Sequence, residues 1–409
     1  MLDHLKSGDF LTRERMRRIA VALGVVYLVA LAALFATSDG MRDYNGRPLG
    51  TDFSNVYAAG QMARDGDGVS AFDPRYHLAR QAEFFNDPDI PVYGWHYPPF
   101  FLLVAAALAL LPYTAAYLVW QAATLPLYLR TVSAIAPRRS SLVAALVLPA
   151  AFVNFTHGQN GFLTAALIGA AMVLLDRRPL VAGVLIGLLA YKPQFGVLIP
   201  LVLIATGRWR VIGAAAATIA GLVAASTLAF GPEVWPAFVD NMRFTNAAIV
   251  DGGGPGWEKV QSLYAALRHI GAPGETAMAA QGALALALAV SVVWLWRSSA
   301  DHGVKAAGLI AASLLATPYV LDYDFVALAP AMAFLAVNGA EKGWGPFEKT
   351  LLALAFAAPL FSRQLAEAAY IPLGFIALAG VYAVALMRAR RTASLGELPK
   401  HIAVRPGPA

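Results

Sequence analysis

Runs of apolar residues recur along the whole chain and are separated by short polar or basic stretches. A helix needs about 20 apolar residues to cross a membrane, and the runs predict about twelve spans. They lie near residues 18–37, 113–130, 141–156, 160–175, 179–191, 195–206, 211–230, 275–297, 303–316, 322–338, 348–362 and 370–388. One further run, 98–111, lies between prolines and is too short to cross comfortably. It predicts a re-entrant or interfacial segment.

The composition supports an apolar exterior. Hydrophobic residues make up 58% of the 409 residues, whereas charged residues make up only 14%. Soluble domains carry about 25% charged residues, so this chain must face lipid. Cysteine is absent, which excludes disulfides and thiolate metal sites. The predicted fold class is therefore an all-α polytopic membrane protein.

The basic residues predict the orientation of the chain. A cluster at Arg13–Arg18 precedes the first apolar run, which has no Ala-x-Ala cleavage site after it. We therefore expect a retained transmembrane helix and not a signal peptide. Most of the 31 Lys and Arg residues fall in cytoplasmic loops if both termini are cytoplasmic, as the positive-inside rule requires. This distribution does not resemble a nucleic-acid footprint. We expect one transmembrane domain, 1–390, and a disordered cytoplasmic tail, 391–409.

Two long loops, 38–97 and 231–274, then fall on the non-cytoplasmic side. The second contains a glycine-rich stretch at 251–256, and a flexible lid and a disordered connector are both compatible with it. The apolar runs on either side of Lys192-Pro193-Gln194 are interrupted by that proline. A break of this kind favours a cavity over a lipid-facing surface.

Five polar motifs from distant parts of the chain converge on the non-cytoplasmic face. They are Asp52, His96-Tyr97-Pro98-Pro99, His157-Gly158-Gln159-Asn160, Lys192-Pro193-Gln194 and Tyr319-Val320-Leu321-Asp322-Tyr323-Asp324. Polar residues with purely structural roles would be scattered over both sides. The one-sided distribution therefore predicts a functional site there.

Asp52 begins a short segment in which Phe53, Val56 and Tyr57 share one helical face. This pattern predicts an amphipathic helix on the membrane surface. Asp52 either caps that helix or acts as a general base at the interface. Lys192 lies between apolar runs, where a lysine either snorkels to the interface or meets an anion such as a lipid phosphate.

The remaining motifs also leave alternatives open. His157, Gln159 and Asn160 either cap a polar hairpin or donate hydrogen bonds to a sugar or phosphate. Asp322 and Asp324 could orient a cation, bind sugar hydroxyls or cap a helix. Their spacing matches no established metal-ligand pattern, and no nucleotide-binding loop, metalloprotease motif or hydrolase nucleophile elbow is present.

Taken in order, these motifs resemble glycosyltransferase family 87, the bacterial polyprenyl-phosphate-mannose-dependent mannosyltransferase-like enzymes with the GT-C-type fold. The resemblance covers about residues 40–340. It rests on these motifs, in this order: Asp52-Phe53, Tyr57-Ala58-Ala59-Gly60, Phe72-Asp73-Pro74, Tyr97-Pro98-Pro99, Gly158-Gln159-Asn160, Lys192-Pro193-Gln194 and Pro318-Tyr319 with Asp322-Tyr323-Asp324.

The resemblance implies an inverting transfer of one sugar from a polyprenyl-phosphate donor to a glycolipid or glycan hydroxyl at the periplasmic face of the inner membrane. Asp52 would be the catalytic base, and no nucleotide or metal cofactor and no nucleic acid would be involved. The donor would bind Lys192, His157, Gln159, Asn160, Gln194 and His96. Residues that contact the acceptor or support the site would be Tyr57, Tyr97, Tyr319, Asp322 and Asp324.

Two other functions remain compatible with the pattern. A transporter or flippase of lipid-linked sugars would bind its substrate at the broken helix near Lys192, although one-sided polar motifs argue against it. A lipid-linked glycan polymerase or ligase would use the same face with a larger groove in the loop 231–274. The sequence does not specify the sugar, and mannose follows from the resemblance alone.

Overall fold

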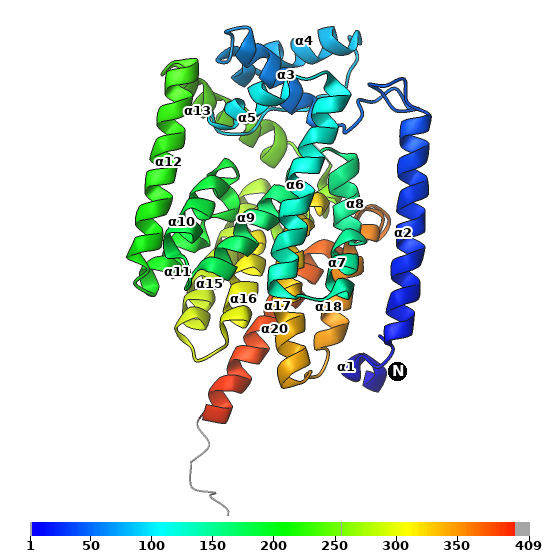
Figure 1. The fold of residues 1–409 in the computed structure, drawn as a ribbon, viewed down its shortest axis with the longest axis vertical. Helices are drawn as coiled ribbons and strands as arrows, with labels where there is room; N and C mark the ends of the chain where they lie inside the picture. The colour runs from blue at the N-terminus through cyan, green and yellow to red at the C-terminus, as the bar shows by residue number, and fades with distance from the viewer. Residues whose placement is uncertain (1, 255, 397–409) are drawn as a thin grey trace, which may run out of the picture.

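The protein is described by a computed structural model, which covers residues 2–254 and 256–396. Within these ranges the regular structure consists of α-helices and short helical turns. The extended pairings there are two isolated bridges, Arg42 with Pro48 and Val260 with Leu321. The prediction of an all-α protein is confirmed. The helices gather into one elongated bundle (Figure 1).

Thirteen helices of the described chain follow the predicted apolar runs. They are α2 (Arg13–Ala36), α6 (Tyr113–Ile135), α7 (Arg139–Leu146), α8 (Pro149–Thr156), α9 (Gly161–Leu174), α10 (Pro179–Leu188), α11 (Leu198–Ala205), α12 (Trp209–Phe230), α15 (Gly274–Arg297), α16 (His302–Ala316), α17 (Leu328–Lys342), α18 (Glu348–Ala357) and α20 (Leu373–Gly396). Other helices lie between them or at the N-terminus: α1 (Leu2–Ser7), α3 (Phe53–Arg64), α4 (Pro74–Phe85), α5 (Phe101–Leu108), α13 (Val234–Thr245), α14 (Leu263–His269) and α19 (Ser362–Ala369).

Five helical segments of the described chain are long and apolar enough to cross a membrane. They are Arg13–Ala36, Trp209–Phe230, Gly274–Arg297, Asp322–Lys342 and Leu373–Thr392. The bent pair α7 and α8, which meet at 50°, adds a sixth if it counts as one span. The chain is therefore a membrane protein with several spans, but the predicted count of twelve is not confirmed. Several other runs form short apolar helices, among them α9 and α16.

Both ends of the described chain lie at the same end of the bundle. In Figure 1 the N-terminal helix α1 and the end of α20 are at the bottom, whereas α3, α4 and α13 lie at the opposite end. This arrangement suits two termini on one side of a membrane, although the side itself stays a prediction. α20 continues to Gly396, so the first residues of the predicted tail are helical, and 397–409 lie outside the described residues.

Glycines bring α10 and α12 into close contact. A Cβ atom added to Gly183 would lie 2.5 Å from the backbone oxygen of Val211. One added to Gly187 would lie 2.8 Å from that of Ala215. Both distances are shorter than any real contact, so only glycine fits at these positions. Small residues four apart in this way let membrane helices pack backbone to backbone.

The break at Lys192-Pro193 is confirmed. α10 ends at Leu188 and is followed by two 3-10 turns, Leu189–Tyr191 and Pro193–Phe195, before α11 begins. Pro193 has no backbone N–H to donate and cannot continue the helix. The turn places Lys192 at the tip of the α10–α11 hairpin, inside the protein, with only 6% of its surface exposed.

The helix after Asp52 differs from the prediction. α3 was expected to be amphipathic and to lie on the membrane surface, but residues 53–60 are all buried. They pack under α4 and against α5, where a Cβ added to Gly60 would lie 2.1 Å from the backbone oxygen of Ala105. The expectation was wrong because α4 and α5 cover the face that was predicted to meet water. The run 98–111 is confirmed as a short element, since α5 at about 12 Å long cannot cross.

At the end of the bundle with the termini, a buried carboxylate joins three helices. Glu348 at the start of α18 is fully buried and accepts hydrogen bonds from Arg388 and Arg391 of α20. Arg388 also donates to Asn338 of α17, at 2.6 Å. Two arginines thus compensate the buried negative charge.

Candidate active site

Asp52 lies at the first turn of α3, but its side chain does not cap that helix. Its Oδ2 instead accepts a hydrogen bond of 2.7 Å from Nε2 of Gln159, 107 residues later in the chain. The residue is half-buried. Among the described residues no partner is found for Oδ1, so this oxygen can accept a proton. The structure thus brings two of the predicted site residues into direct contact.

The turn that carries Gln159 has glycines on both sides. Gly158 has a φ of +64°, and a Cβ there would lie 2.5 Å from Cβ of Phe53. On the other side, a Cβ on Gly161 would lie 2.8 Å from the backbone oxygen of Tyr323. Glycine is therefore required at both positions. The turn therefore packs tightly between Phe53, next to Asp52, and Tyr323, in the segment before α17.

Gln159 and Asn160 connect Asp52 to a buried tyrosine. Nδ2 of Asn160 donates to the hydroxyl oxygen of Tyr97 at 2.8 Å, and this hydroxyl lies 3.5 Å from Oε1 of Gln159. The hydroxyl of Tyr191 donates to the backbone oxygen of Asn160 at 3.2 Å. Oδ1 of Asn160 is buried without a partner among the described residues. The network fixes the amide of Gln159 in the orientation that lets it donate to Asp52.

Lys192 forms a buried ion pair with Asp324. Their Nζ and Oδ1 atoms are 2.7 Å apart, and the two side chains are only 7% and 4% exposed. Oδ2 of Asp324 accepts the backbone N–H of Leu321 at 3.0 Å. The ammonium also lies 5.4 and 5.5 Å from the ring centres of Phe195 and Tyr323. Lys192 therefore does not snorkel to the interface but meets an anion, the carboxylate of Asp324. Its contact with a lipid phosphate stays a prediction.

Asp322 is paired with an arginine that the sequence analysis did not identify. Nε and Nη2 of Arg363, on α19, donate to the two carboxylate oxygens at 2.6 and 2.8 Å. Oδ1 of Asp322 also accepts the N–H of Tyr323. Burial opposes the charge of Arg363, but its bonds with Asp322 and the charges of Asp322 and Asp52 raise its pKa above the ordinary value. Arg363 is a basic residue in a predicted outer loop, where the positive-inside rule expects few. This unusual position was the sequence feature that could have identified it as a site residue.

Three tyrosines surround these charges. Burial raises the pKa of Tyr97 well above its ordinary value, and the neighbouring Tyr191, Asp52 and Asp324 raise it further. Burial, Asp52 and Asp324 raise the pKa of Tyr319 in the same way. Burial and Asp52 raise the pKa of Tyr93 to about 12. All three hydroxyls stay protonated at neutral pH and can donate hydrogen bonds.

Other predicted site residues make contacts of their own. The hydroxyl of Tyr57 donates to the backbone oxygen of Leu111, and Nδ1 of His157 contacts that of Val153, in its own helix. Nδ1 of His96 lies 2.8 Å from Oγ1 of Thr245, and burial lowers the pKa of His96 to about 4. Gln194 is half-buried, and its side chain makes no hydrogen bond within the described chain. The structure therefore does not bring these four residues to Asp52 by direct contact.

The second long loop is attached beside Tyr319. Gln261 donates its N–H to the backbone oxygen of Val320 at 2.7 Å, and Oγ of Ser262 donates to that of Pro318 at 2.6 Å. The glycine-rich stretch precedes these anchors, and Pro255 within it lies outside the described residues. Its predicted role as a lid stays a prediction. No cluster of three or more metal-ligating side chains occurs in the ranges that the structure describes.

Comparison with known proteins gives one result. No curated protein and no solved structure shows a significant match to this chain. The sequence pattern of glycosyltransferase family 87 matches residues 95–318, a range that contains Tyr97, Gln159, Asn160 and Lys192. Asp52 precedes the matched range, and Asp322 and Asp324 lie a few residues beyond its end. Because the match covers more than half of the chain, the protein belongs to glycosyltransferase family 87.

Proposed function

We propose that this glycosyltransferase moves one sugar, with inversion, from a polyprenyl-phosphate donor to a hydroxyl of a glycolipid or glycan, at the periplasmic face of a bacterial inner membrane. The observation that carries the proposal is the carboxylate of Asp52. It is half-buried, one oxygen is oriented by Gln159, and the other has no partner among the described residues. A carboxylate held in this way suits a general base.

The reaction needs one proton transfer and one leaving group. Oδ1 of Asp52 takes the proton of the acceptor hydroxyl while the hydroxyl oxygen attacks the anomeric carbon. The bond from that carbon to the phosphate oxygen breaks, and the lipid phosphate leaves with an added negative charge. A general base in such a step commonly contributes about 10²- to 10⁴-fold in rate.

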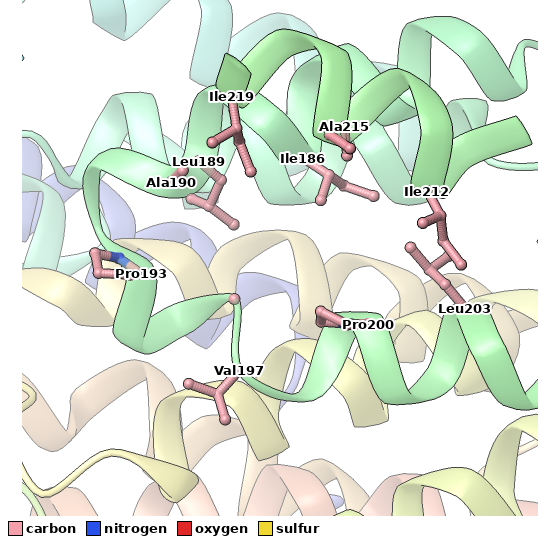
Figure 2. Close-up of a pocket in the computed structure, with 12 residues that line it drawn as sticks. Ile186, Leu189, Ala190, Pro193, Val197, Pro200, Leu203, Ile212, Ala215 and Ile219 are labelled. Atoms are coloured by element: carbon pink, nitrogen blue, oxygen red, sulfur yellow. The ribbon is translucent and has the colours of Figure 1, made fainter. Parts of the chain in front are cut away.

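An apolar groove supports a lipid-linked donor. It has a volume of about 400 Å³ and is lined by Ile186, Leu189, Ala190, Pro193, Gly196, Val197, Pro200, Leu203, Ile212, Ala215, Ala216 and Ile219. Figure 2 shows these side chains between α10, α11 and α12, with Pro193 at one end and Leu203 and Ile212 at the other. Pro193 follows Lys192 directly, so one end of this groove lies at the tip of the α10–α11 hairpin, beside the candidate site.

The sugar is proposed to be mannose, on the resemblance to the family alone. The tyrosine hydroxyls around Asp52, together with Asn160, offer donors of the kind that bind sugar hydroxyls. Tyr319, Asp322 and Asp324 would then support the site from the α17 side. No observation of this structure specifically favours a flippase or a glycan polymerase.

A direct test supplies purified protein in lipid nanodiscs with a panel of radiolabelled polyprenyl-phosphate sugars and membrane lipid extracts. The proposal expects transfer of one labelled sugar to a lipid or glycan, with inversion at the anomeric carbon in the product. Transfer of a preassembled oligosaccharide would instead indicate a ligase. Movement of label between membrane leaflets without a new glycosidic bond would indicate a flippase.

A further inference from the structure

The charges around Asp52 do not by themselves favour the binding of an anionic sugar donor. Three carboxylates, those of Asp52, Asp322 and Asp324, face two cations, Lys192 and Arg363. A lipid phosphate adds negative charge, and more develops as the sugar leaves. Such a group needs a cation that still has donors to offer.

Lys192 is poorly placed to donate hydrogen bonds to a phosphate. Its ammonium is 2.7 Å from Asp324, the side chain is 7% exposed, and two aromatic rings lie about it. To reach a phosphate it would have to leave Asp324 as a buried unpaired carboxylate, a change that typically costs several kcal/mol. Lys192 is therefore a poor hydrogen-bond donor to a phosphate that binds and leaves in each catalytic cycle.

Arg363 differs in each of these respects. Its side chain is 29% exposed, and Asp322 occupies only Nε and Nη2. Nη1 has no partner among the described residues. A guanidinium carries five N–H donors, so one edge can hold Asp322 while another faces a ligand. The charge of Asp52 acts on Arg363, so the guanidinium lies within electrostatic range of the base.

We propose that Arg363 binds the phosphate of the donor and stabilises the charge of the leaving group. Asp322 is a positioning residue, since it is buried and holds the guanidinium through two hydrogen bonds. The planar fork of arginine suits the oxygen atoms of a phosphate. This inference rests on the proposed function, because it names the residue that receives the leaving group of that reaction.

The test compares Arg363→Met and Arg363→Lys with Arg75→Met as a matched control. Arg75 lies on α4, and its side chain is 86% exposed. The kcat and KM for the donor are measured, together with inhibition by polyprenyl phosphate and by the neutral polyprenol. Arg363→Met should lose about 10²- to 10³-fold in kcat and at least about tenfold in affinity for polyprenyl phosphate. Inhibition by polyprenol should be unchanged, and Arg75→Met should behave as the unmodified protein.

Two further variants keep the result interpretable. Arg363→Ala should regain activity when guanidinium is added, which a purely structural role would not allow. Asp322→Asn should weaken phosphate inhibition less than Arg363→Met does. If Arg363→Met does not fold, Arg363→Lys, which retains the charge, replaces it in the test. The deciding quantity is then the ratio of its inhibition by polyprenyl phosphate to its inhibition by polyprenol. Unchanged phosphate inhibition in the folded variants overturns the inference, whereas the proposed function fails separately if Asp52→Asn transfers sugar at the full rate.

Discussion

The buried pair of Lys192 and Asp324 allows a quantitative prediction. Lys192→Met removes the ammonium and leaves the carboxylate of Asp324 buried, with the N–H of Leu321 as its remaining partner. Asp324→Asn removes the negative charge and leaves the ammonium against the rings of Phe195 and Tyr323. Each single variant therefore leaves one uncompensated charge in the interior of the protein.

The magnitudes follow from this geometry. Loss of one partner of a buried ion pair typically costs about 3–5 kcal/mol, and Lys192→Met should fall in that range. Asp324→Asn should cost somewhat less, because two cation–π contacts, each worth up to about 2 kcal/mol when desolvated, remain. The double variant has no buried charge here, and the asparagine that replaces Asp324 can still accept the N–H of Leu321 through its side-chain oxygen. Its free energy of unfolding should lie within about 2 kcal/mol of the unmodified protein.

The assay is a double-mutant cycle on the free energy of unfolding, measured by SDS titration in mixed micelles with tryptophan fluorescence. We expect a coupling energy of about 3 kcal/mol, far above the ~0.5 kcal/mol within which independent sites are additive. Additive effects of the two substitutions would refute the ion pair. Retention of polyprenyl phosphate inhibition by the double variant would also agree with Arg363, and not Lys192, as the phosphate ligand.

Three further outcomes follow from single sites. Glu348→Ala should lower the free energy of unfolding by about 3–5 kcal/mol, because two arginines lose their buried partner; a loss under about 1 kcal/mol would contradict this. Gly158→Ala should abolish most sugar transfer, since its φ of +64° and the 2.5 Å approach to Phe53 leave no room for a methyl group. An active and equally stable variant would contradict this close packing of the turn against Phe53. Burial lowers the pKa of His77 and His96 from 6.5 to about 4. As the pH falls, these histidines therefore bind protons in the unfolded chain before they do so in the folded protein. The free energy of unfolding should fall as the pH drops from 6.5 to about 4. His77→Leu should reduce that dependence in thermal unfolding at a series of pH values.

The sequence predicts local structure in this protein well. Apolar runs become helices because lipid and core both require apolar side chains and a helix satisfies its own backbone. Pro193 has no backbone N–H for an intrahelical hydrogen bond, so the break beside Lys192 could be predicted. The number of spans could not be predicted in the same way, because several apolar runs form helices shorter than a full span, among them α9 and α16. Their depth in the membrane depends on tertiary packing.

The pairing of charges could not be read in the same way. Lys192 and Asp324 lie 132 residues apart, and Asp322 and Arg363 lie 41 apart. The motifs identified three of these four residues, but nothing in a local pattern specifies which cation meets which carboxylate. The burial of α3 escaped prediction for a related reason, since α4 and α5, which pack against it, come later in the chain. Gln159 was predicted as a donor to a ligand, and the structure shows it as a donor to Asp52.

The central claim is that the carboxylate of Asp52 removes a proton from the acceptor. The most direct measurement is the single-turnover rate of Asp52→Asn with a saturating polyprenyl-phosphate sugar, beside Asp89→Asn, which neutralises an exposed carboxylate of the same loop. We expect Asp52→Asn to bind polyprenyl phosphate normally and to transfer at least about 10²-fold more slowly, with Asp89→Asn unaffected. Equal rates for the two variants would contradict the account.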